Sequence, residues 1–249
     1  MQRYFIELAY NGTNFHGWQI QPNAKSVQEE INKCFSAFLR EEINVVGAGR
    51  TDAGVHSSYF VLHFDTSVNI DTENFIYKMN RFLPTDIAIF SVRPVIGDGH
   101  ARFSALSRTY HYYIQKRKNP FNNSFAYNLS TKLNIDKMNE AAKKILVFED
   151  FTSFSKLHTD VKTNNCKVEY AKWYEKDDQL IFEIKADRFL RNMVRAIVGT
   201  LLEVGKGKLS VEDFVKIIED KDRGKAGASA PAQGLFLTGI EYPDSIYKA

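Results

Sequence analysis

The sequence predicts an α+β fold that consists of two tandem units, each with the element order β-α-β-β-α-β. Short stretches in which apolar and polar residues alternate indicate strands, and longer amphipathic stretches that follow capping residues indicate helices. The order of these stretches in the first half of the chain is repeated in the second half, although the residues themselves are not. With 249 residues, 44% of them hydrophobic, the chain is long enough for one large domain or for two domains of ordinary size with a real core.

The first unit is expected to cover residues 1–98. Its first helix begins at the capping sequence SVQE, which starts at Ser26, and its second helix is capped by Asp71 and stops at the proline that follows it. The boundary to the second unit is expected near Gly97–Gly99. The strands are expected in the stretches YFIELAY, SSYFVLHF and DIAIFSV and, as a short strand, in residues 43–48.

The second unit is expected to cover residues 99–249 and to follow the same order. One helix is expected from Asp136 to Val147, a second from Phe189 to Val204, and an additional one after the cap at Ser210. The stretches NCKVEYAKWY and LIFEIKA predict a hairpin. Further strands are predicted by RTYHYYI and LFLTGIEY, and long loops by residues 117–131 and 221–234.

The composition is typical of a protein of the cytoplasm. The net charge is only +3, so the chain as a whole does not indicate a nucleic-acid partner. Cys34 and Cys166 lie far apart in the sequence and have no metal-ligand spacing, which favours a reducing compartment. The N-terminus leads directly into the stretch RYFIELAYNG, so no signal peptide is expected. The most apolar stretch, 189–204, contains two arginines, so no membrane span is expected.

Positive charge is concentrated in residues 99–135, which contain no acidic residue. Because basic side chains can follow a phosphate backbone and aromatic faces can stack on unpaired bases, this stretch is a candidate RNA-binding surface. A solvated basic edge on an ordinary strand and loop is the alternative. The basic residues are Arg102, Arg108, Lys116, Arg117, Lys118 and Lys132, and the interleaved aromatic residues are Phe103, Tyr110, Tyr112, Tyr113, Phe121, Phe125 and Tyr127.

A second basic element is expected on the predicted helix at 189–204. Its apolar residues form one face, and Arg188, Arg191 and Arg195 follow one another on the other side at steps of three and four residues. Small neighbouring residues would let a large partner approach the backbone there. A helix with an ion-paired outer face is the alternative, although the nearest acid along the helix, Glu203, lies two turns beyond Arg195.

The stretch GAGRTDAGVH, residues 47–56, surrounds Asp52 with small residues and places Arg50 two positions before it. It lacks the Lys-Ser/Thr that completes a phosphate-binding P-loop. A structural turn, in which Asp52 accepts hydrogen bonds from backbone amides, is one interpretation. A metal site is another, although its candidate ligands show no compact spacing; they are Asp52, His56, His63 and Asp65.

A catalytic carboxylate is the third interpretation of this stretch. Glycines allow positive φ angles and let a substrate come close to the backbone. Arg50 would keep Asp52 ionised by charge pairing, so that the carboxylate could act as a nucleophile or as a base. No second acid accompanies it, which disfavours the paired-acid chemistry of glycosidases.

GRTDAGVH closely resembles the signature of the TruA family of tRNA pseudouridine(38–40) synthases. Further stretches resemble blocks of this family in the family's order, so the resemblance covers essentially the whole chain. GRTDAGVH is highly specific, whereas each of the other stretches alone would be moderately specific. They are YNGTNFHGWQIQ with SVQEEI, HARFSALSRTYHYYI, DFTSF, NMVRAIVGTLLEVG and GLFLTGIEYP.

The resemblance implies a fold, a reaction and an assembly. The family fold consists of two ferredoxin-like halves with mainly antiparallel sheets, joined around a central basic cleft. Its members convert uridines at positions 38, 39 and 40 in the anticodon stem-loop of tRNA to pseudouridine, without a cofactor or a metal. They act as homodimers in which one tRNA contacts both subunits.

The resemblance also assigns site residues. Asp52 matches the catalytic aspartate of the family, and Arg50 matches the arginine beside it. Tyr110 matches the tyrosine that packs on the target base, and Arg195 matches the arginine that pairs with the aspartate. RNA contacts are expected from four further arginines, Arg102, Arg108, Arg188 and Arg191.

The chain departs from many relatives at Arg191-Asn192, and this extra cation could alter contacts with RNA. Because the family varies at residues 116–118 and 226–233, the resemblance assigns no role there. Two other classes of protein compete with this interpretation. A non-catalytic RNA-binding module would keep the basic, aromatic surface but would not need Asp52 in a glycine-rich loop. A metal-dependent phosphoesterase would lose its activity to a chelator.

Overall fold

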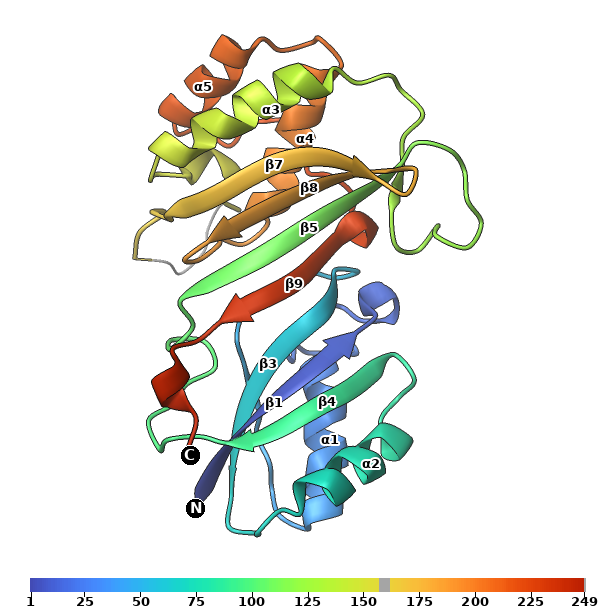
Figure 1. Cartoon of the computed structure of the whole chain (residues 1–249), viewed down its shortest axis with the longest axis vertical. Helices are drawn as coiled ribbons and strands as arrows, with labels where there is room; N and C mark the ends of the chain where they lie inside the picture. The colour runs from blue at the N-terminus through green and yellow to red at the C-terminus, as the bar shows by residue number, and fades with distance from the viewer. Residues whose placement is uncertain (157–161, 249) are drawn as a thin grey trace. The chain divides into compact units, whose positions relative to one another are not determined.

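The computed structural model describes residues 1–156 and 162–248 (Figure 1). The chain forms two compact units. The first unit combines Met1–Leu106 with Leu237–Ala249, and the second unit is Ser107–Phe236. Contacts thus group residues 99–106 and the C-terminal segment with the first unit, and the division of the chain into domains 1–98 and 99–249 stays a prediction.

The first unit has the predicted order β-α-β-β-α-β. Its strands pair antiparallel in the order β4-β1-β3, and the short β2 pairs with β3 (Figure 1). Both helices cover the same face of this sheet. The elements are β1 (Gln2–Tyr10), the 3₁₀ turn η1 (Gly12–Asn14), α1 (Val27–Leu39), β2 (Val46–Gly47), β3 (His56–Thr66), α2 (Thr72–Phe82) and β4 (Ile87–Pro94).

The helices of the first unit begin where the sequence predicts. Ser26 caps α1, because its hydroxyl accepts a hydrogen bond from the Glu29 amide at 3.3 Å. Asp71 caps α2 in the same way. The helices pack on the sheet through a fully buried aromatic cluster, in which the Phe35 ring lies 5.3 Å from the Phe64 ring.

The C-terminal segment completes the first unit. The Leu106 amide donates to the Glu241 carbonyl at 2.8 Å. The Tyr242 hydroxyl donates to the Ala101 carbonyl, and the Tyr242 ring packs edge-on against Phe5, with 5.1 Å between ring centroids. These contacts tie the last residues of the chain to its first strand.

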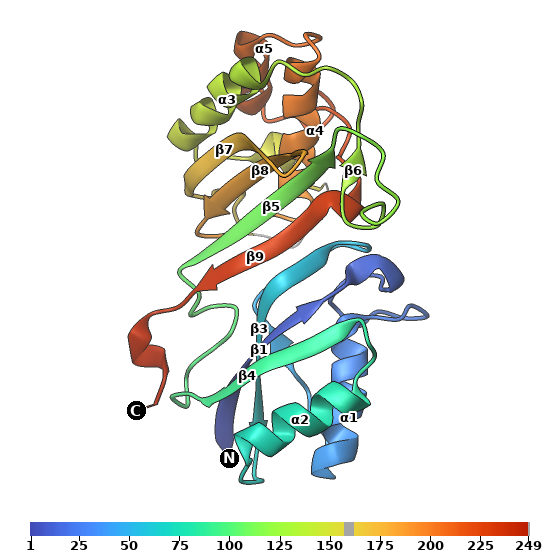
Figure 2. The same cartoon turned by 45° about the vertical axis from the view of Figure 1, so that its right-hand side comes forward.

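The second unit repeats the element order with one additional helix. Its sheet has the antiparallel order β5-β8-β7, and α3, α4 and α5 lie on one face of it (Figure 2). The two-residue β6 pairs parallel with β5, and β9 crosses the boundary between the two units. The elements are β5 (Ser107–Gln115), β6 (Tyr127–Asn128), α3 (Ile135–Lys144), β7 (Val168–Lys176), β8 (Gln179–Ala186), α4 (Met193–Gly205), α5 (Val211–Glu219) and β9 (Leu235–Glu241), with 3₁₀ turns at Ile145–Val147, Thr152–Phe154, Ala232–Gly234 and Asp244–Ile246.

The α+β fold class with two runs of β-α-β-β-α-β is confirmed. The predicted hairpin is also confirmed: β7 and β8 are joined by Asp177 and Asp178, which both have positive φ, 50° and 63°. Two successive residues of this kind form a type I′ turn, which matches the twist of paired strands. Ser210 caps α5 with a complete capping box.

The start of α4 was predicted wrongly. The helix begins at Met193 instead of Phe189, because Asn192 adopts the left-handed conformation with φ 66° and ψ 0°. Arg188 and Arg191 therefore lie in the segment before the helix. The expected stripe of three arginines along one helix face does not form, and only Arg195 lies on α4.

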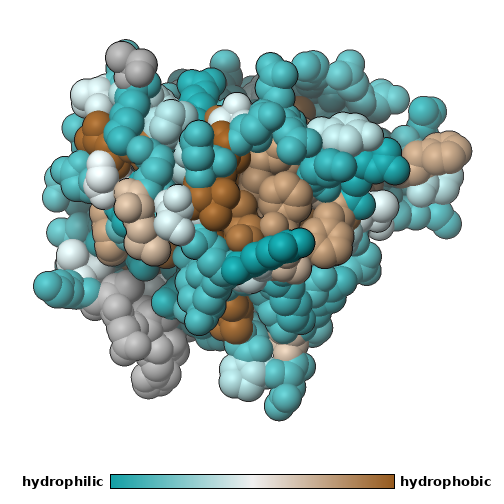
Figure 3. Space-filling view, turned by 90° about the horizontal axis from the view of Figure 1, so that it is seen from below, coloured by the Kyte–Doolittle hydropathy of each residue, from teal (hydrophilic) through white to brown (hydrophobic). Residues whose placement is uncertain are grey.

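The surface of the molecule includes exposed apolar side chains. Phe82 at the end of α2 and Phe90 in β4 are each 55% exposed. Figure 3 shows apolar side chains gathered in the middle of one face and surrounded by polar ones. In the part of the chain that the structure describes, no helix combines the length and the apolar character needed to cross a membrane.

Candidate active site

The loop that carries Asp52 connects β2 to β3 in the first unit. The Asp52 carbonyl accepts a hydrogen bond from the Val55 amide at 3.1 Å, which closes a four-residue turn. Gly54, the third residue of this turn, has a φ of 75°, a conformation that glycine adopts without strain. The Asp52 side chain itself is only partly buried. The turn therefore presents a carboxylate at the surface of the unit on a well-defined backbone.

The end of β1 and the residues that follow it hold this loop from both sides. Before Asp52, the buried Thr51 hydroxyl lies 2.9 Å from the Tyr10 hydroxyl, and the Thr51 carbonyl accepts from the Trp18 amide at 3.3 Å. After Asp52, the Gly54 amide donates to the Phe15 carbonyl at 3.3 Å. Because both flanks are bonded to residues 10–18, the backbone at Asp52 has little freedom to move.

Two glycines in this holding segment allow the close approach. A Cβ on Gly12 would lie 2.0 Å from the Val55 carbonyl oxygen, and a Cβ on Gly17 would lie 2.3 Å from the Thr51 carbonyl oxygen. Real Cβ atoms do not come this close to backbone atoms. This role was not predicted from the sequence, in which its only signal is the pair of glycines in YNGTNFHGW.

Arg50 has an exposed side chain. Among the described residues, its guanidinium makes no hydrogen bond and no ion pair. The pairing of Arg50 with Asp52 that the sequence suggested is therefore not formed here. The Arg50 guanidinium, two positions before Asp52 in the sequence, is therefore available to bind a partner molecule.

Three of the four residues of the alternative metal site, His56, His63 and Asp65, have other partners. The His56 Nδ1 accepts from the Gly12 amide at 3.0 Å, and the His63 Nδ1 accepts from the Ala101 amide at 3.1 Å. Asp65 forms a bidentate ion pair with Arg3, at 2.8 and 2.6 Å. Within residues 1–156 and 162–248, no group of three or more His, Cys, Asp or Glu side chains could hold a metal ion.

Tyr110 lies in β5 of the second unit, opposite Ile184 of β8. It shares a strand face with Tyr112, which is completely buried, because alternate residues of a strand point to the same side. The Tyr110 ring is partly exposed, and the Phe189 ring meets it edge-on at 86°, with 5.1 Å between centroids. Phe189 thus limits the positions of the tyrosine ring without covering it.

Arg195 lies in the first turn of α4 and is bonded to Ala230 at two points. Its Nε donates to the Ala230 carbonyl at 2.7 Å, and its own carbonyl accepts from the Ala230 amide at 2.9 Å. The next residue, Pro231, accepts from the Tyr112 hydroxyl at 2.9 Å. Burial raises the pKa of that hydroxyl, and the positive charge of Arg195 acts in the opposite direction.

The four arginines expected to contact RNA differ in their surroundings. Arg108 donates to the Asp187 carbonyl at 2.8 Å, and Arg188 is partly buried next to the same aspartate. Arg191 is exposed, and Arg102 is exposed over the Phe103 ring at 5.5 Å. Three of the four, all but Arg102, belong to the second unit.

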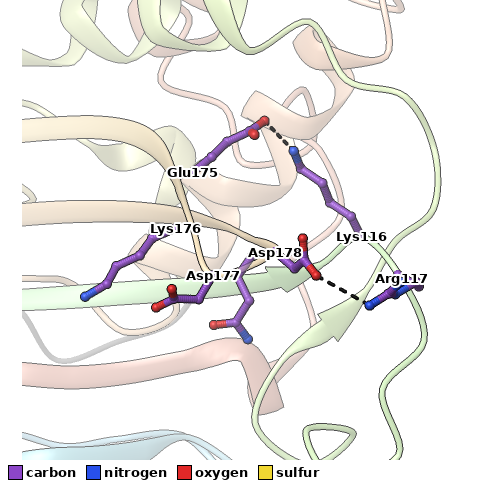
Figure 4. A pocket seen from close by; sticks show the side chains of 7 residues that line it. Lys116, Arg117, Glu175, Lys176, Asp177 and Asp178 are labelled. Atoms are coloured by element: carbon purple, nitrogen blue, oxygen red, sulfur yellow. Dashed lines mark hydrogen bonds and ion pairs between the residues drawn. The ribbon is translucent and has the colours of Figure 1, made fainter.

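A pocket of about 360 Å³ lies at the tip of the β7–β8 hairpin (Figure 4). Its basic residues are matched by acidic ones: Lys116 pairs with Glu175, and Arg117 lies 3.5 Å from Asp178. This pocket contains none of the predicted catalytic residues. A second hollow, of about 740 Å³, is lined by residues 132–137 and 204–207 and contains none of them either.

The chain is similar in sequence to known proteins over nearly its whole length. The profile of a family described as tRNA pseudouridine synthase matches residues 8–104 and 141–243. A protein of Bacteroides thetaiotaomicron named tRNA pseudouridine synthase A is 58% identical over 250 residues, which cover 99% of this chain and 93% of that protein. Proteins of the same name are 57% identical in Bacteroides fragilis, over 100% of this chain and 99% of that protein, and 40% identical in Bacillus subtilis, over 94% and 97%. Since the profile match and these alignments each cover most of the chain, the chain belongs to the tRNA pseudouridine synthase family.

Proposed function

We propose that the protein isomerises uridine to pseudouridine at positions 38, 39 and 40 in the anticodon stem-loop of tRNA. Membership of the family and the names of the full-length relatives support the reaction. The observation that carries the proposal is the GRTDAGVH loop, in which Asp52 stands partly exposed on a backbone bonded on both sides. We further propose that the protein acts in the cytoplasm as a homodimer.

The reaction moves a bond without adding or removing atoms. The C1′–N1 glycosidic bond of uridine breaks, a C1′–C5 bond forms, the C5 proton leaves and N1 gains a proton. The Asp52 carboxylate acts either as a nucleophile, at the ribose or at the base, or as a base on a route through a glycal intermediate. All three routes need one ionised carboxylate at the reacting centre.

The target base has to leave the stacked stem-loop before it can react. Tyr110 then packs on the extruded uracil, and its partly exposed ring, supported edge-on by Phe189, suits this role. The site also has to exclude water, because water would capture the ribose once the base has detached. Tyr110 assists the loss of the C5 proton at this stage.

Cations complete the proposed site. Arg195 pairs with Asp52 and keeps its carboxylate ionised during the reaction. Arg50 approaches the carboxylate or a neighbouring phosphate once RNA is bound, which agrees with its exposure in the protein alone. Arg102, Arg108, Arg188 and Arg191 bind phosphates and supply affinity rather than chemistry.

The test is to map pseudouridine in tRNA after incubation with the purified protein, and to follow the release of tritium from uracil C5. The wild type should modify uridines 38–40, and Asp52→Ala should abolish turnover while it keeps most of the affinity for tRNA, because phosphate contacts supply the binding. Asp98→Asn, which changes an exposed carboxylate outside the loop, is the control and should stay active. Pseudouridine formation by Asp52→Ala would disprove the assignment.

A non-catalytic RNA-binding module is the second candidate, and the basic, aromatic stretch at 99–135 favours it. Such a module would bind tRNA and release no tritium from C5. A metal-dependent phosphoesterase would be inactivated by a chelator, whereas the proposed synthase should keep its rate. The tritium-release assay therefore separates the synthase from both alternatives, and hydrolysis of phosphoesters that a chelator abolishes would identify the phosphoesterase.

A further inference from the structure

The segment from Gly227 to Ala230 lies directly on α4, between the first turn of the helix and its middle. A Cβ on Gly199 would lie 1.8 Å from the Ala228 carbonyl oxygen, so only glycine fits at this point of the helix. The Gly227 amide donates to the Thr200 hydroxyl at 2.9 Å. Glycine and alanine in the segment thus serve a close contact between two backbones, and the stretch is an ordered part of the second unit rather than a free loop.

Ser229 is the centre of this contact. Its hydroxyl accepts a hydrogen bond from Asn192 Nδ2 at 2.7 Å and a second one from Arg223 Nη2 at 3.0 Å. Arg223 also donates through Nη1 to the Gly227 carbonyl at 3.2 Å. One hydroxyl therefore joins the residue before α4 to an arginine that follows α5.

Asn192 is suited to its place in this network. Its φ of 66° lies in the left-handed region, which asparagine and glycine tolerate better than other residues. In this conformation its side-chain amide reaches Ser229, while its carbonyl accepts from the Ala196 amide at 3.0 Å. Asn192 therefore starts the helix and holds the segment at the same time.

The residue next to Ser229 is Ala230, which holds Arg195 through both its amide and its carbonyl. The position of the Ala230 carbonyl decides where Arg195 Nε is held, and therefore how the planar guanidinium is turned. A long, flexible arginine side chain otherwise loses much rotamer entropy when it is ordered, so a carbonyl already in place makes an ordered guanidinium less costly.

We propose that Ser229, with Asn192 and Arg223, forms a clamp that positions the guanidinium of Arg195 for the reaction. The inference rests on the proposed function, in which Arg195 pairs with Asp52. Ser229, Asn192 and Arg223 are positioning residues: they act on Arg195 through the Ala230 carbonyl. Nothing in the family resemblance assigned them a role.

The experiment compares Ser229→Ala with Ser229→Thr and with Ser210→Ala. Ser229→Ala leaves the two donors without their acceptor, and it should lower kcat for pseudouridine formation about tenfold to a hundredfold, the size of effect expected when a reacting group is misplaced by a fraction of an ångström to 1 Å. KM and tRNA affinity should stay within about twofold, because phosphate contacts supply the binding. Ser229→Thr keeps a hydroxyl and should restore most of the rate.

Ser210→Ala is the matched control for stability. It removes the cap of α5 and should lower the melting temperature by a similar amount, but it does not touch the clamp, so its kcat should stay at the wild-type value. A loss of kcat that appears in Ser229→Ala and not in Ser210→Ala is an effect on Arg195 and not on folding.

A double-mutant cycle with Arg195→Lys tests the link directly. Lysine lacks Nε, so the clamp has nothing to position, and Ser229→Ala should cause no further loss of kcat in that background. Independent effects, in which the two losses multiply, would overturn the inference. So would a wild-type kcat in Ser229→Ala.

The outcomes also separate this inference from the proposed function. A wild-type protein that forms no pseudouridine contradicts the function itself, and the clamp with it. An active wild type with an equally active Ser229→Ala contradicts the clamp alone. An active Arg195→Lys with the wild-type rate contradicts the role of Arg195.

Discussion

Gly17 lies against Thr51 so closely that a Cβ on Gly17 would stand 2.3 Å from the Thr51 carbonyl oxygen. Gly17 also has a φ of 93°, and its own carbonyl accepts from the Val27 amide at 3.2 Å, at the first turn of α1. One residue thus connects the first helix to the loop that carries Asp52. A side chain here would have to push the two apart.

Gly17→Ala should lower the free energy of unfolding by about 2 kcal/mol or more, since it adds both a positive-φ strain and a backbone clash. It should also lower the rate of pseudouridine formation more than it lowers tRNA affinity, because the residue that it displaces, Thr51, is next to Asp52. The control is Gly49→Ala in the same loop, where a Cβ would meet nothing within 4 Å. Equal stabilities of the two variants in urea unfolding would contradict the role of Gly17.

Arg50→Gln should leave the free energy of unfolding within about 0.5 kcal/mol of the wild type, because exposed residues without partners contribute little to stability. Among the described residues the guanidinium has no hydrogen bond or ion pair to lose. The same change should lower the rate of the reaction with tRNA. It should also reduce the slope of log K against log salt concentration for tRNA binding by about 1, the value for one phosphate contact.

Arg3→Gln is the comparison for Arg50. It breaks the bidentate pair with Asp65, so it should cost stability and leave the salt dependence of tRNA binding unchanged. An Arg50→Gln protein that unfolds more easily and binds tRNA with the wild-type salt dependence would show that Arg50 is structural.

His63 should make the protein less stable in acid. Burial, followed by the positive charges of Arg3 and His100, lowers the pKa of His63 to about 4 from an ordinary 6.5, although Asp65 acts in the opposite direction. The His63 ring therefore binds a proton below pH 6.5 in the unfolded chain, but only near pH 4 in the folded protein. The stabilising contribution is complete above pH 6.5 and is lost as the pH falls through this range.

The size of the His63 effect should be about 2 kcal/mol between pH 7 and pH 4.5, measured by urea unfolding at each pH. His63→Asn keeps an acceptor for the Ala101 amide and removes the titrating ring, so it should flatten this part of the pH profile. An unchanged slope in the variant would assign the acid sensitivity to other groups.

Both thiols should be unreactive in the folded protein. Cys166 is 2% exposed, and burial raises the pKa of its thiol to about 12; burial also raises the pKa of Cys34. Because the thiolate is the reactive form, a disulfide reagent at pH 8 should label neither residue in the native state and both after unfolding. Rapid labelling of the native protein would contradict the burial of the reacting cysteine.

The elements that the sequence predicted well are those with local causes. Caps such as Ser26 and Asp71 act within three residues, and the turn at Asp177-Asp178 is decided by its own two residues. The start of α4 was missed because its cause is distant. Nothing in the sequence around Asn192 stops a helix, and the contact that accompanies its left-handed conformation comes from Ser229.

The residues of the candidate site also differ in whether the sequence near them could reveal them. Asp52, Tyr110 and Arg195 were found through motifs that resemble a family, and their roles in the reaction stay predictions. The expected pairing of Arg50 with Asp52 rested on two positions of spacing in the sequence, but the side chain points to solvent. Ser229 could not be recognised, because a stretch rich in glycine and alanine reads as a loop until the helix beneath it is known.

The return of the chain to its first unit at Leu237 has a consequence for synthesis on the ribosome. The Leu106 amide cannot bond to the Glu241 carbonyl until the ribosome has translated the whole second unit. Translation of that unit takes about ten seconds or more at ordinary elongation rates. The second unit is one continuous stretch and can fold as it emerges from the exit tunnel. The nascent first unit, by contrast, lacks residues 237–249 until the second unit has been made, and until then it is the part of the nascent chain that is open to a chaperone.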